Sequence, residues 1–328
     1  NPTGKDIDIN GWTIEDDDTD SHVIDNGGPL IIPKKGYLVL GSNDNSLTNG
    51  DVPVDYEYDY EDFSLYYRYD EIVIRDTDGN IIDFVRYNWG ANATFPDLEG
   101  ASMALVDLDS DNNVGENWCR SNTMFADPAT CDYCNDHGTP GAANSFSIAD
   151  PGDVVINEIM KNPDAAYDSS GEWIELYNPT GKDIDITGWT IADNDTDSHA
   201  IAPYVEPGET GDGSLIIPKK GYLVLGRNEN TLYNGNVPVD YEYWGINLGN
   251  VGDEVILLDS CSNVIDIVEY NGGDNSTFPD PEGASMALRD FDSDNNDAEN
   301  WCTSTTTFGA GDSGTPGAAN DCPEEEED

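Results

Sequence analysis

The chain has 328 residues and a formal net charge of -54, because 67 Asp and Glu residues stand against only 13 Lys and Arg. A chain this acidic repels phosphate backbones and anionic headgroups, which excludes nucleic acid as a partner and argues against membrane insertion. No stretch approaches the roughly 18 apolar residues of a transmembrane helix, and the length suits two domains of about 150 residues each.

The same passage occurs twice in the chain. NPTGKDIDI stands at 1–9 and again at 178–186, and both EGASMAL and GTPGAAN also occur in each half. A period of about 180 residues is far longer than a solenoid repeat, and it indicates the duplication of a whole domain.

The second copy has a beginning that the first copy lacks. VVINEIM (154–160) and GEWIELY (171–177) both read as strands, and nothing before Asn1 matches them. The first domain therefore starts two strands late, at a point where a sandwich would be left with an open edge. Either a strand from a neighbouring chain completes it, or the preceding strands were removed from a longer chain, of which this is a mature or trimmed form. We expect a first domain at 1–144, a linker at 145–152, a complete second domain at 153–320 and an acidic tail at 321–328.

Strand signals continue through the second copy. In IDITGWTI (184–191) apolar residues alternate across a glycine, which predicts a half-buried strand with a bulge or bend. PKKGY (218–222) predicts a turn in which Gly221 supplies the positive φ. Two β-branched runs at 255–259 and 264–270 predict a hairpin, whose counterpart in the first copy has Asp-Gly at its tip. No 3.6-residue apolar period lasts three turns, so the chain is expected to be all-β.

Several of these motifs, taken in order, carry a family resemblance. INEIM, GEWIELYN, DITGWTI, IPKKGYLVLG, DEVILLD and VEYN resemble the lamin tail domain, an immunoglobulin-like sandwich of nuclear lamins and of many secreted bacterial and archaeal proteins. The acidic insertions and the GTPGAAN ending resemble the microbial surface versions. The resemblance implies two tandem immunoglobulin-like β-sandwiches, the first lacking its first two strands. It implies no shared catalytic centre, because the family is a module attached to many architectures.

Carboxylates at alternate positions mark one loop in each copy, VDLDSDNNVGENW and RDFDSDNNDAENW. In a tight, Asn-rich turn these carboxylates can direct several hard oxygen ligands toward one ion, which predicts calcium binding. The alternative is a plain acidic surface loop. The sixth place is Asn and the twelfth is Trp, which excludes an EF-hand proper. The candidate ligands are Asp107, Asp109, Asp111 and Glu116 in the first copy, and Asp290, Asp292, Asp294 and Glu299 in the second.

A second acidic cluster, EDDDTDSH and its counterpart ADNDTDSH, directly follows the strand that contains the tryptophan. Alternation along an extended segment places the carboxylates on one face, where their repulsion favours a cation, although a solvated loop is equally compatible. His22 and His199 end the two motifs, either as ligands or as hydrogen-bonding groups of the turn. The carboxylates are Asp16, Asp18 and Asp20 in the first copy, and Asp193, Asp195 and Asp197 in the second.

The segment YEYDYEDFSLYYRYDE (56–71) is rich in tyrosine, where the second copy has only YEYWGINLGNVGDE. Tyrosine is favoured in protein contacts, so these aromatics predict an interface. Two other interpretations are the covering of a core left open by the missing strands, and stacking on carbohydrate. The residues concerned are Tyr56, Tyr58, Tyr60, Phe63, Tyr66, Tyr67 and Tyr69.

Six cysteines in a chain of this composition are typical of disulfides formed outside the cell. One Trp-Cys pair stands at the same place in each copy, and the other cysteines fall in loops specific to one copy. Zinc binding is the alternative to a disulfide for Cys131-x-x-Cys134, but no second Cys or His pair stands at the spacing of zinc ligands. The favoured pairings join Cys119 to Cys131 or Cys134, and Cys302 to Cys322 or Cys261.

The sequence contains no GxSxG, HExxH or phosphate-cradling glycine loop, and its one imaginable acid/base pair, Glu158 and Glu172, stands in strands. We therefore expect no enzyme. The expected function is that of a secreted, calcium-stabilised structural protein, a self-assembling subunit of an extracellular filament or surface layer. The alternative is an adhesive module of a larger cell-surface protein that binds carbohydrate or cells. The expected partners are copies of itself, joined by strand addition at the edge near Ile7, Ile9 and Trp12, or other surface proteins.

Overall fold

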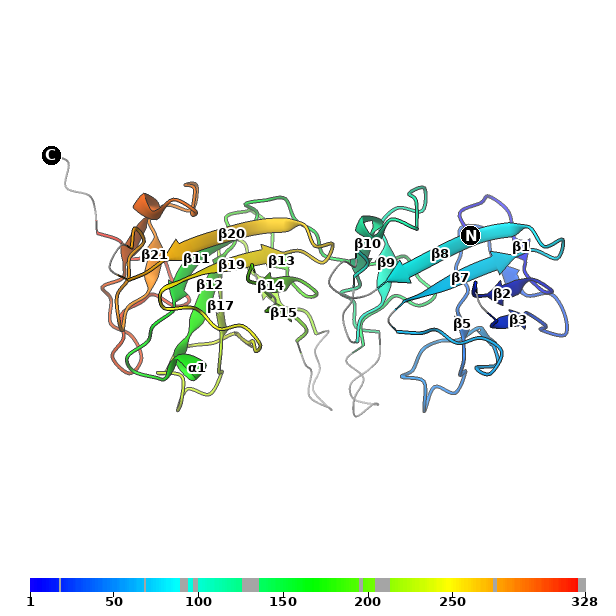
Figure 1. Ribbon diagram of the computed structural model, residues 1–328, viewed down its shortest axis with the longest axis horizontal. Helices are drawn as coiled ribbons and strands as arrows, with labels where there is room; N and C mark the ends of the chain where they lie inside the picture. Colours follow the sequence, from blue (N-terminus) through cyan, green and yellow to red (C-terminus); the bar gives the residue numbers. More distant parts are fainter. Residues whose placement is uncertain are drawn as a thin grey trace. The chain divides into compact units, whose positions relative to one another are not determined.

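A computed structural model describes residues 1–17, 19–67, 69–88, 94–96, 100–125, 136–194, 197–203, 213–273 and 276–323. The chain divides into two compact units: unit 1 holds Asn1–Phe146, and unit 2 holds Ser147–Pro203 and the chain from Ser214 on. Both units are built of strands (Figure 1), which confirms the prediction of an all-β fold. In the described part of the chain the α-helical content is one turn, α1 (Asp168–Gly171).

The larger sheet of unit 2 has six strands in the order β18-β17-β12-β11-β21-β22. Its two central strands, β11 and β12, are antiparallel to each other; β12 also pairs with β17, and β11 with β21. All their side chains are buried, because one face packs on the core and the other is covered by the C-terminal segment. The bounds are Tyr241–Glu242 (β18), Tyr222–Gly226 (β17), Trp173–Tyr177 (β12), Val155–Met160 (β11), Met286–Leu288 (β21) and Trp301–Thr303 (β22).

The smaller sheet of unit 2 has the order β15-β14-β19-β20, and the core lies between the two sheets around Trp189. The predicted bend is present: IDITGWTI divides into β13 and β14 at Gly188, whose φ is 81°. The predicted hairpin is also present as β19 and β20. The bounds are Ile184–Asp185 (β13), Thr190–Ala192 (β14), Ser198–Ala200 (β15), Ile216–Ile217 (β16), Gly252–Leu258 (β19) and Val264–Asn271 (β20), with β13 paired to β16.

The PKKGY turn forms in both copies, but the expected role of its glycine is wrong. The positive φ belongs to Lys220, at 54°, and to Lys35 in the first copy, also at 54°. Gly221 serves to leave space instead, because a Cβ there would lie 3.0 Å from both the Cβ and the carbonyl oxygen of Pro218.

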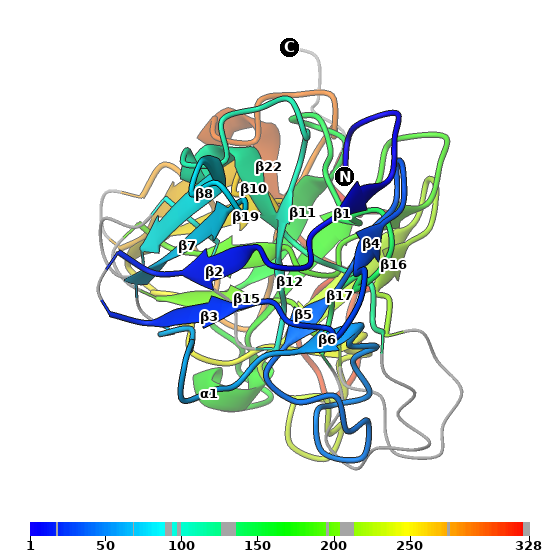
Figure 2. The ribbon, with the colours of Figure 1, turned by 90° about the vertical axis from the view of Figure 1, so that its right-hand side faces the viewer.

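Unit 1 has the smaller sheet complete, in the order β3-β2-β7-β8, and the larger sheet only in parts. What corresponds to the larger sheet is one parallel pair, β5–β6, and one antiparallel pair, β9–β10. Figure 2 shows the β2–β3 and β5–β6 pairs of unit 1 toward the viewer. The bounds are Ile7–Asp8 (β1), Thr13–Glu15 (β2), Ser21–Val23 (β3), Ile31–Ile32 (β4), Leu40–Gly41 (β5), Tyr56–Glu57 (β6), Tyr69–Arg75 (β7), Ile81–Asn88 (β8), Met103–Leu105 (β9) and Trp118–Arg120 (β10).

The two strands of unit 2 that precede the repeated sequence, β11 and β12, stand at the centre of a sheet, which corrects the expectation of an open edge near Ile7, Ile9 and Trp12. That segment forms β1 and β2, which pair with β4, β3 and β7. Ile9 is buried, and Ile7 and Trp12 pack partly buried against the same cluster. The counterparts in unit 1 of their neighbours β17 and β21 are β5 and β9.

Candidate functional site

The candidate site is the part of the larger sheet that surrounds β12 and β11 in unit 2, compared with the same place in unit 1. In unit 2, β17 and β21 stand on either side of the β12–β11 pair. Their counterparts in unit 1 are β5 and β9, and in the described part of the chain β5 pairs only with β6, and β9 only with β10. The outer pairs of the larger sheet are thus the same in both units.

Side chains at this place are less covered in unit 1 than in unit 2. Leu225, Met286 and Leu288 are buried in unit 2, whereas their counterparts Leu40 and Met103, and the leucine that ends β9, are only half-buried.

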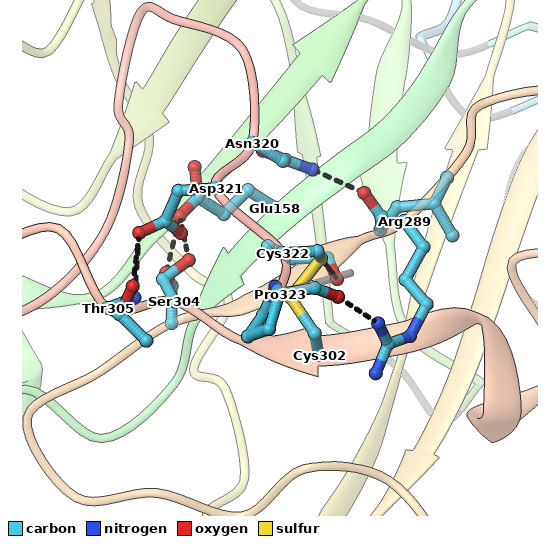
Figure 3. Close-up of a disulfide and its surroundings, with 12 residues drawn as sticks. Glu158, Arg289, Cys302, Ser304, Thr305, Asn320, Asp321, Cys322 and Pro323 are labelled. Carbon is cyan, nitrogen blue, oxygen red and sulfur yellow. Dashed lines mark hydrogen bonds between the residues drawn. A yellow bond between two sulfur atoms is a disulfide. The ribbon is translucent and has the colours of Figure 1, made fainter. Parts of the chain in front are cut away.

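The central strands of unit 2 carry two buried glutamates, Glu158 in β11 and Glu175 in β12, which are cross-strand neighbours. Glu158 accepts hydrogen bonds from the Ser285 hydroxyl, from the Ser304 hydroxyl at 3.0 Å, and from Thr315 N and Oγ1 at 2.9 and 2.8 Å. Figure 3 shows the contact between Glu158 and Ser304 beside the disulfide. The carboxylate thus joins a central strand to both β21–β22 and the C-terminal segment.

Glu175 is also held by hydrogen bonds from neighbouring groups. It accepts hydrogen bonds from Asn157 Nδ2 at 2.7 Å and from Gly317 N at 2.5 Å. Burial, and then the charge of Glu158, raises the pKa of Glu175 to about 8. Burial likewise raises the pKa of Glu158, although its hydrogen bonds oppose that shift.

Unit 1 retains the donors that hold these glutamates in unit 2. Within the repeated EGASMAL, Trp-Cys-x-Ser and GTPGAAN sequences, the counterparts of the three hydroxyl donors are Ser102, Ser121 and Thr139. Ser121 is buried, and the two serine hydroxyls lie 3.1 Å apart. Asn144 Nδ2 donates to Leu105 O at 2.9 Å, as its counterpart does in unit 2. The donors and the backbone around them are therefore already arranged as in the complete sheet.

An acceptor that contacts β11 in unit 2 also has its counterpart in unit 1. In unit 2, Asp266 accepts hydrogen bonds from Ile156 N at 2.6 Å and from Asn295 Nδ2 at 2.7 Å, and burial raises its pKa to about 6. Its counterpart Asp83 accepts the same side-chain bond, from Asn112 Nδ2 at 2.9 Å, but is exposed.

Sequence reasoning missed Ser102, Ser121 and Thr139. It considered Glu158 only as half of an imaginable acid/base pair that stands in strands. A usable signal was present, because EGASMAL and GTPGAAN are kept in both copies although the strands they contact occur in only one.

The loops predicted to bind calcium fold through hydrogen bonds of their own. Asp290 Oδ1 accepts from Asp292 N at 3.0 Å, and Asp294 Oδ1 accepts from Asn296 N at 3.0 Å, so both carboxylates form Asx turns. Trp301 Nε1 donates to a carbonyl of the same loop at 2.7 Å. The first copy repeats all three bonds, through Asp107, Asp111 and Trp118.

The fourth candidate ligand of each loop lies in a short 3-10 helix: Glu116 in η1 (Gly115–Asn117) and Glu299 in η2 (Ala298–Asn300). Over the ranges that the structure describes, no three His, Cys, Asp or Glu side chains gather as a metal site requires. The structure thus gives the spaced aspartates a role in shaping the loops, and calcium binding stays a prediction.

The first and last carboxylates of the second acidic cluster belong to one turn in each copy. Asp16 Oδ1 accepts from Asp20 N at 3.1 Å, and Asp193 Oδ1 accepts from Asp197 N at 3.2 Å. The central members, Asp18 and Asp195, lie outside the described residues.

The histidines that follow this cluster bond to tyrosine. His22 Nε2 lies 2.8 Å from Tyr56 Oη, and His199 Nε2 lies 2.8 Å from Tyr241 Oη. Burial lowers the pKa of His199 to about 4, so this ring is neutral at physiological pH. The arrangement favours the interpretation of both histidines as structural groups.

The tyrosine-rich segment divides into an inner and an outer part. Tyr58 and Phe63 are buried in the core of unit 1 with ring centroids 5.4 Å apart, and the Tyr56 hydroxyl bonds His22. These three residues fit the interpretation of core cover. Four others are exposed, namely Tyr60, Tyr66, Tyr67 and Tyr69.

Three exposed tyrosines form a cluster beside acidic groups. The Tyr66 ring lies 5.0 Å from that of Tyr67 and 5.5 Å from that of Tyr69. Next to them is a hollow lined by Asp16, Asp17, Asp20, Ser64, Tyr66, Tyr69, Asp70 and Glu71. An aromatic surface with carboxylate acceptors suits either a protein contact or a sugar ring.

Disulfides involve every described cysteine. Cys302 and Cys322 are bonded to each other, which is one of the two pairings considered for Cys302 and excludes Cys261 as its partner. Cys119 and Cys261 each take part in a disulfide as well. The remaining two candidates, and with them the zinc alternative, lie outside the described residues: Cys131 and Cys134. Structural disulfides are typical of an oxidising compartment.

The strand order and the family comparison agree. A family model of the Lamin Tail Domain matches residues 1–89 and 147–272. The chain belongs to the lamin tail domain family. One matched segment falls in each unit, which confirms two tandem lamin tail domains with an immunoglobulin-like β-sandwich fold. The lamin tail domain is a non-enzymatic kind of domain.

Other comparisons add little to this lamin tail protein. Among curated proteins none matches the chain. A solved DUF4876 family protein from Bacteroides thetaiotaomicron is similar at 9% identity, over 97% of this chain and 92% of that chain, with a TM-score of 0.29, which is too low to establish a shared fold. No helix among the described residues has the length and apolar character needed to cross a membrane.

Proposed function

We infer that this lamin tail protein is a non-catalytic, extracellular structural subunit that assembles with neighbouring chains into a filament or surface layer. The observation that carries the proposal is the cluster of exposed tyrosines in unit 1, Tyr66, Tyr67 and Tyr69, because exposed tyrosine is favoured in protein contacts. A head-to-tail contact between neighbouring chains does not close on itself, so it extends into a polymer.

Two further properties support an extracellular site of action. Disulfides such as Cys302–Cys322 persist where thiols are oxidised. The net charge of -54 opposes close contact between chains unless cations reduce it, so we include bound calcium in the proposal.

The proposal is tested on native material. Negative-stain microscopy should show ordered polymers or layers, and crosslinking with mass spectrometry should join lysines of unit 1, such as Lys34 and Lys35 near β4 and β5, to another chain. Calcium chelation should loosen the assemblies. If the native protein is monomeric and its crosslinks stay within one chain, the proposed function is wrong.

A second candidate function is adhesion to carbohydrate, favoured by the hollow beside Tyr66 and Tyr69. Aromatic rings stack on sugar faces, and the neighbouring carboxylates accept hydrogen bonds from hydroxyls. Binding to a glycan array that is abolished by Tyr66→Ala, and kept in Tyr233→Ala, an exposed tyrosine of unit 2, would favour adhesion over assembly.

A further inference from the structure

We propose that the hollow beside the exposed tyrosines of unit 1 binds a lysine-bearing turn of unit 2 from a second copy of this chain. The inference rests on the proposed function, since it names the two surfaces by which one chain holds the next. It is carried by the chemistry of the hollow, by the distribution of lysine over the chain, and by two differences between the repeated copies.

The hollow combines aromatic rings with carboxylates. Its volume is about 500 Å³, within the range of sites that take up a small ligand or a few side chains. Tyr66 and Tyr69 line it, and both are exposed. Aromatic rings next to acidic groups suit a cation, because the ring face and the carboxylate both attract positive charge.

Part of the negative charge in the hollow is unmatched. Arg86 pairs with Asp17 at 2.7 Å and with Glu71 at 2.7 Å. Asp20 and Asp70 instead accept hydrogen bonds from neutral groups, and no described basic side chain forms an ion pair with either. An ammonium group that enters the hollow therefore meets carboxylates that still lack an ion-pair partner.

Lysine, in turn, is concentrated at one place in each copy. Six of the seven lysines of the chain fall in the repeated NPTGKD and IPKKGY sequences. In unit 2 these two segments adjoin, because Lys219 N donates to Asp183 Oδ1 at 2.8 Å, and Asn178 Nδ2 donates to both Lys182 O and Ile217 O. We call Lys182, Lys219 and Lys220 the lysine tip of unit 2; all three are exposed.

The lysine tip is the kind of surface that an acidic neighbour accepts. Lys182 has only a distant carboxylate, Asp153 at 3.7 Å, and among the described residues the Lys219 amine has no acceptor. At physiological ionic strength the Debye length is about 8 Å, so a tip inside the hollow is attracted by the carboxylates around it while the rest of the two chains repel each other only weakly. A contact between oppositely charged patches can thus form despite the net charge of -54.

The hollow belongs to unit 1 because unit 2 lacks its rings. Gly249 and Gly252 stand in unit 2 at the places of Tyr66 and Tyr69. The backbone turn is the same in both, since Gly249 N donates to the aspartate of the turn at 2.6 Å and Tyr66 N does so at 2.5 Å. The two copies therefore differ in the side chains that would contact a neighbour and not in the turn that carries them.

The lysine tip of unit 2 also differs from the equivalent turn of unit 1. Lys220 Nζ lies 6.0 Å from the centroid of the Phe291 ring, which is partly exposed and stacks with Tyr177 at 4.8 Å. Unit 1 has Leu108 at the place of Phe291. A ring beside the lysines can pack against the tyrosines of the hollow, which favours the tip of unit 2 over that of unit 1. The contact then joins unlike surfaces of two copies, head to tail, and extends into a polymer.

The test uses two double variants of the full chain. Lys182→Glu with Lys219→Glu reverses the charge of the tip, and Tyr66→Ser with Tyr69→Ser removes the rings of the hollow. In sedimentation velocity, each variant alone should associate about tenfold more weakly than the wild type or worse, because a patch of the contact is lost. An equimolar mixture of the two should form heterodimers that grow no further, because the tyrosine variant keeps its tip and the lysine variant keeps its hollow.

Matched changes in the other copy control for charge and for exposed tyrosine. Lys5→Glu with Lys34→Glu makes the same charge change at the equivalent turn of unit 1, and it should leave association within about twofold of the wild type. Tyr233→Ser, at an exposed tyrosine of unit 2, should do the same. In mixtures of light and isotope-labelled chains, carbodiimide should crosslink Lys182 or Lys219 of one chain to a carboxylate of the hollow in another.

The inference is overturned if the mixture forms no heterodimers, or if the lysine variants of both units lose association equally. Glycan binding that Tyr66→Ala abolishes, with association unchanged, would assign the hollow to carbohydrate instead. If the wild type and both double variants all form polymers, the proposed function survives and this contact is wrong. If native wild-type chains are monomeric, the proposed function fails as well.

Discussion

Two adjacent carboxyl groups lie at the centre of the complete sheet, and their environment fixes their protonation. Glu158 and Glu175 are cross-strand neighbours, both buried, and each is bonded to the segment that ends the chain. Burial disfavours the ionised form, and ionising one of the pair makes it harder to ionise the other. The folded state therefore holds a proton at a pH where the unfolded chain has released it.

We expect unit 2 to become less stable as pH rises from 5 to 8. The pKa of Glu175 is raised from 4.5 to about 8, so its contribution to stability is complete below the unfolded value and is lost as pH rises through the folded one. Burial raises the pKa of Glu172 to about 7 and that of Asp266 to about 6, and both act in the same direction. Calorimetry at fixed ionic strength should show a melting temperature that falls by several degrees over this range.

The substitution Glu175→Gln isolates this effect. It keeps an acceptor for Gly317 N without the charge, so it should raise the melting temperature at pH 8 and flatten the pH dependence. Glu229→Gln, at an exposed position of the same unit, should change neither. A Glu175→Gln protein that is destabilised equally at every pH would show that hydrogen bonding, and not proton uptake, dominates at this residue.

At the scale of elements, the long strands could be predicted from the sequence, but the strands that pair with them could not. The β-branched runs predict β11, β12 and the β19–β20 hairpin because each contains its own signal. That local signal does not reveal that the first two strands of unit 2 stand in the middle of its larger sheet, because the order of strands in a sheet is set by pairing between distant segments. The existence of β11 and β12 could thus be predicted, and their place in the sheet could not.

Short elements were missed for a related reason. Strands β9, β10, β21 and β22 are three residues long each, and they adjoin segments rich in Asp, Asn and Gly that carry no strand signal. They form because β9 pairs with β10, and β21 with β22, across a loop that is closed by Asx turns and by a hydrogen bond from a tryptophan N–H. The same limit applies to Ser102, Ser121 and Thr139, which come from separate segments and converge only in the folded unit.

The Cys302–Cys322 disulfide ties the C-terminal segment to β22. It closes a loop with a sequence separation of 20, and that loop contains Thr315 and Gly317, which hold the central glutamates. Replacing both cysteines by serine should lower the unfolding free energy of unit 2 by about 3 kcal/mol, because the unfolded chain regains the freedom of the loop. Denaturant unfolding monitored by tryptophan fluorescence measures the loss. A change below about 1 kcal/mol would mean that the segment is held by its hydrogen bonds alone.

At the scale of the whole molecule, electrostatic repulsion between like charges opposes folding. A net charge of -54 spread over 328 residues makes the compact state repel itself, and cations must oppose that repulsion in any environment where the chain is folded. Monovalent ions do so by screening over a Debye length, whereas a bound divalent ion removes two charges at one place. These two mechanisms respond differently to a chelator and to salt.

We expect excess EGTA at low ionic strength to lower the melting temperature of the full chain by several degrees, because an ion bound only to the folded state stabilises it by mass action. Asp292→Ala should reproduce much of the loss for unit 2, since Asp290 and Asp294 use their carboxylates for the turns of the loop and the Asp292 carboxylate remains for an ion. Glu229→Gln serves as the control for removing one exposed charge. Differential scanning calorimetry with and without added calcium measures each case. A melting temperature that ignores EGTA but rises steeply with monovalent salt would contradict bound calcium and assign the stabilisation to screening.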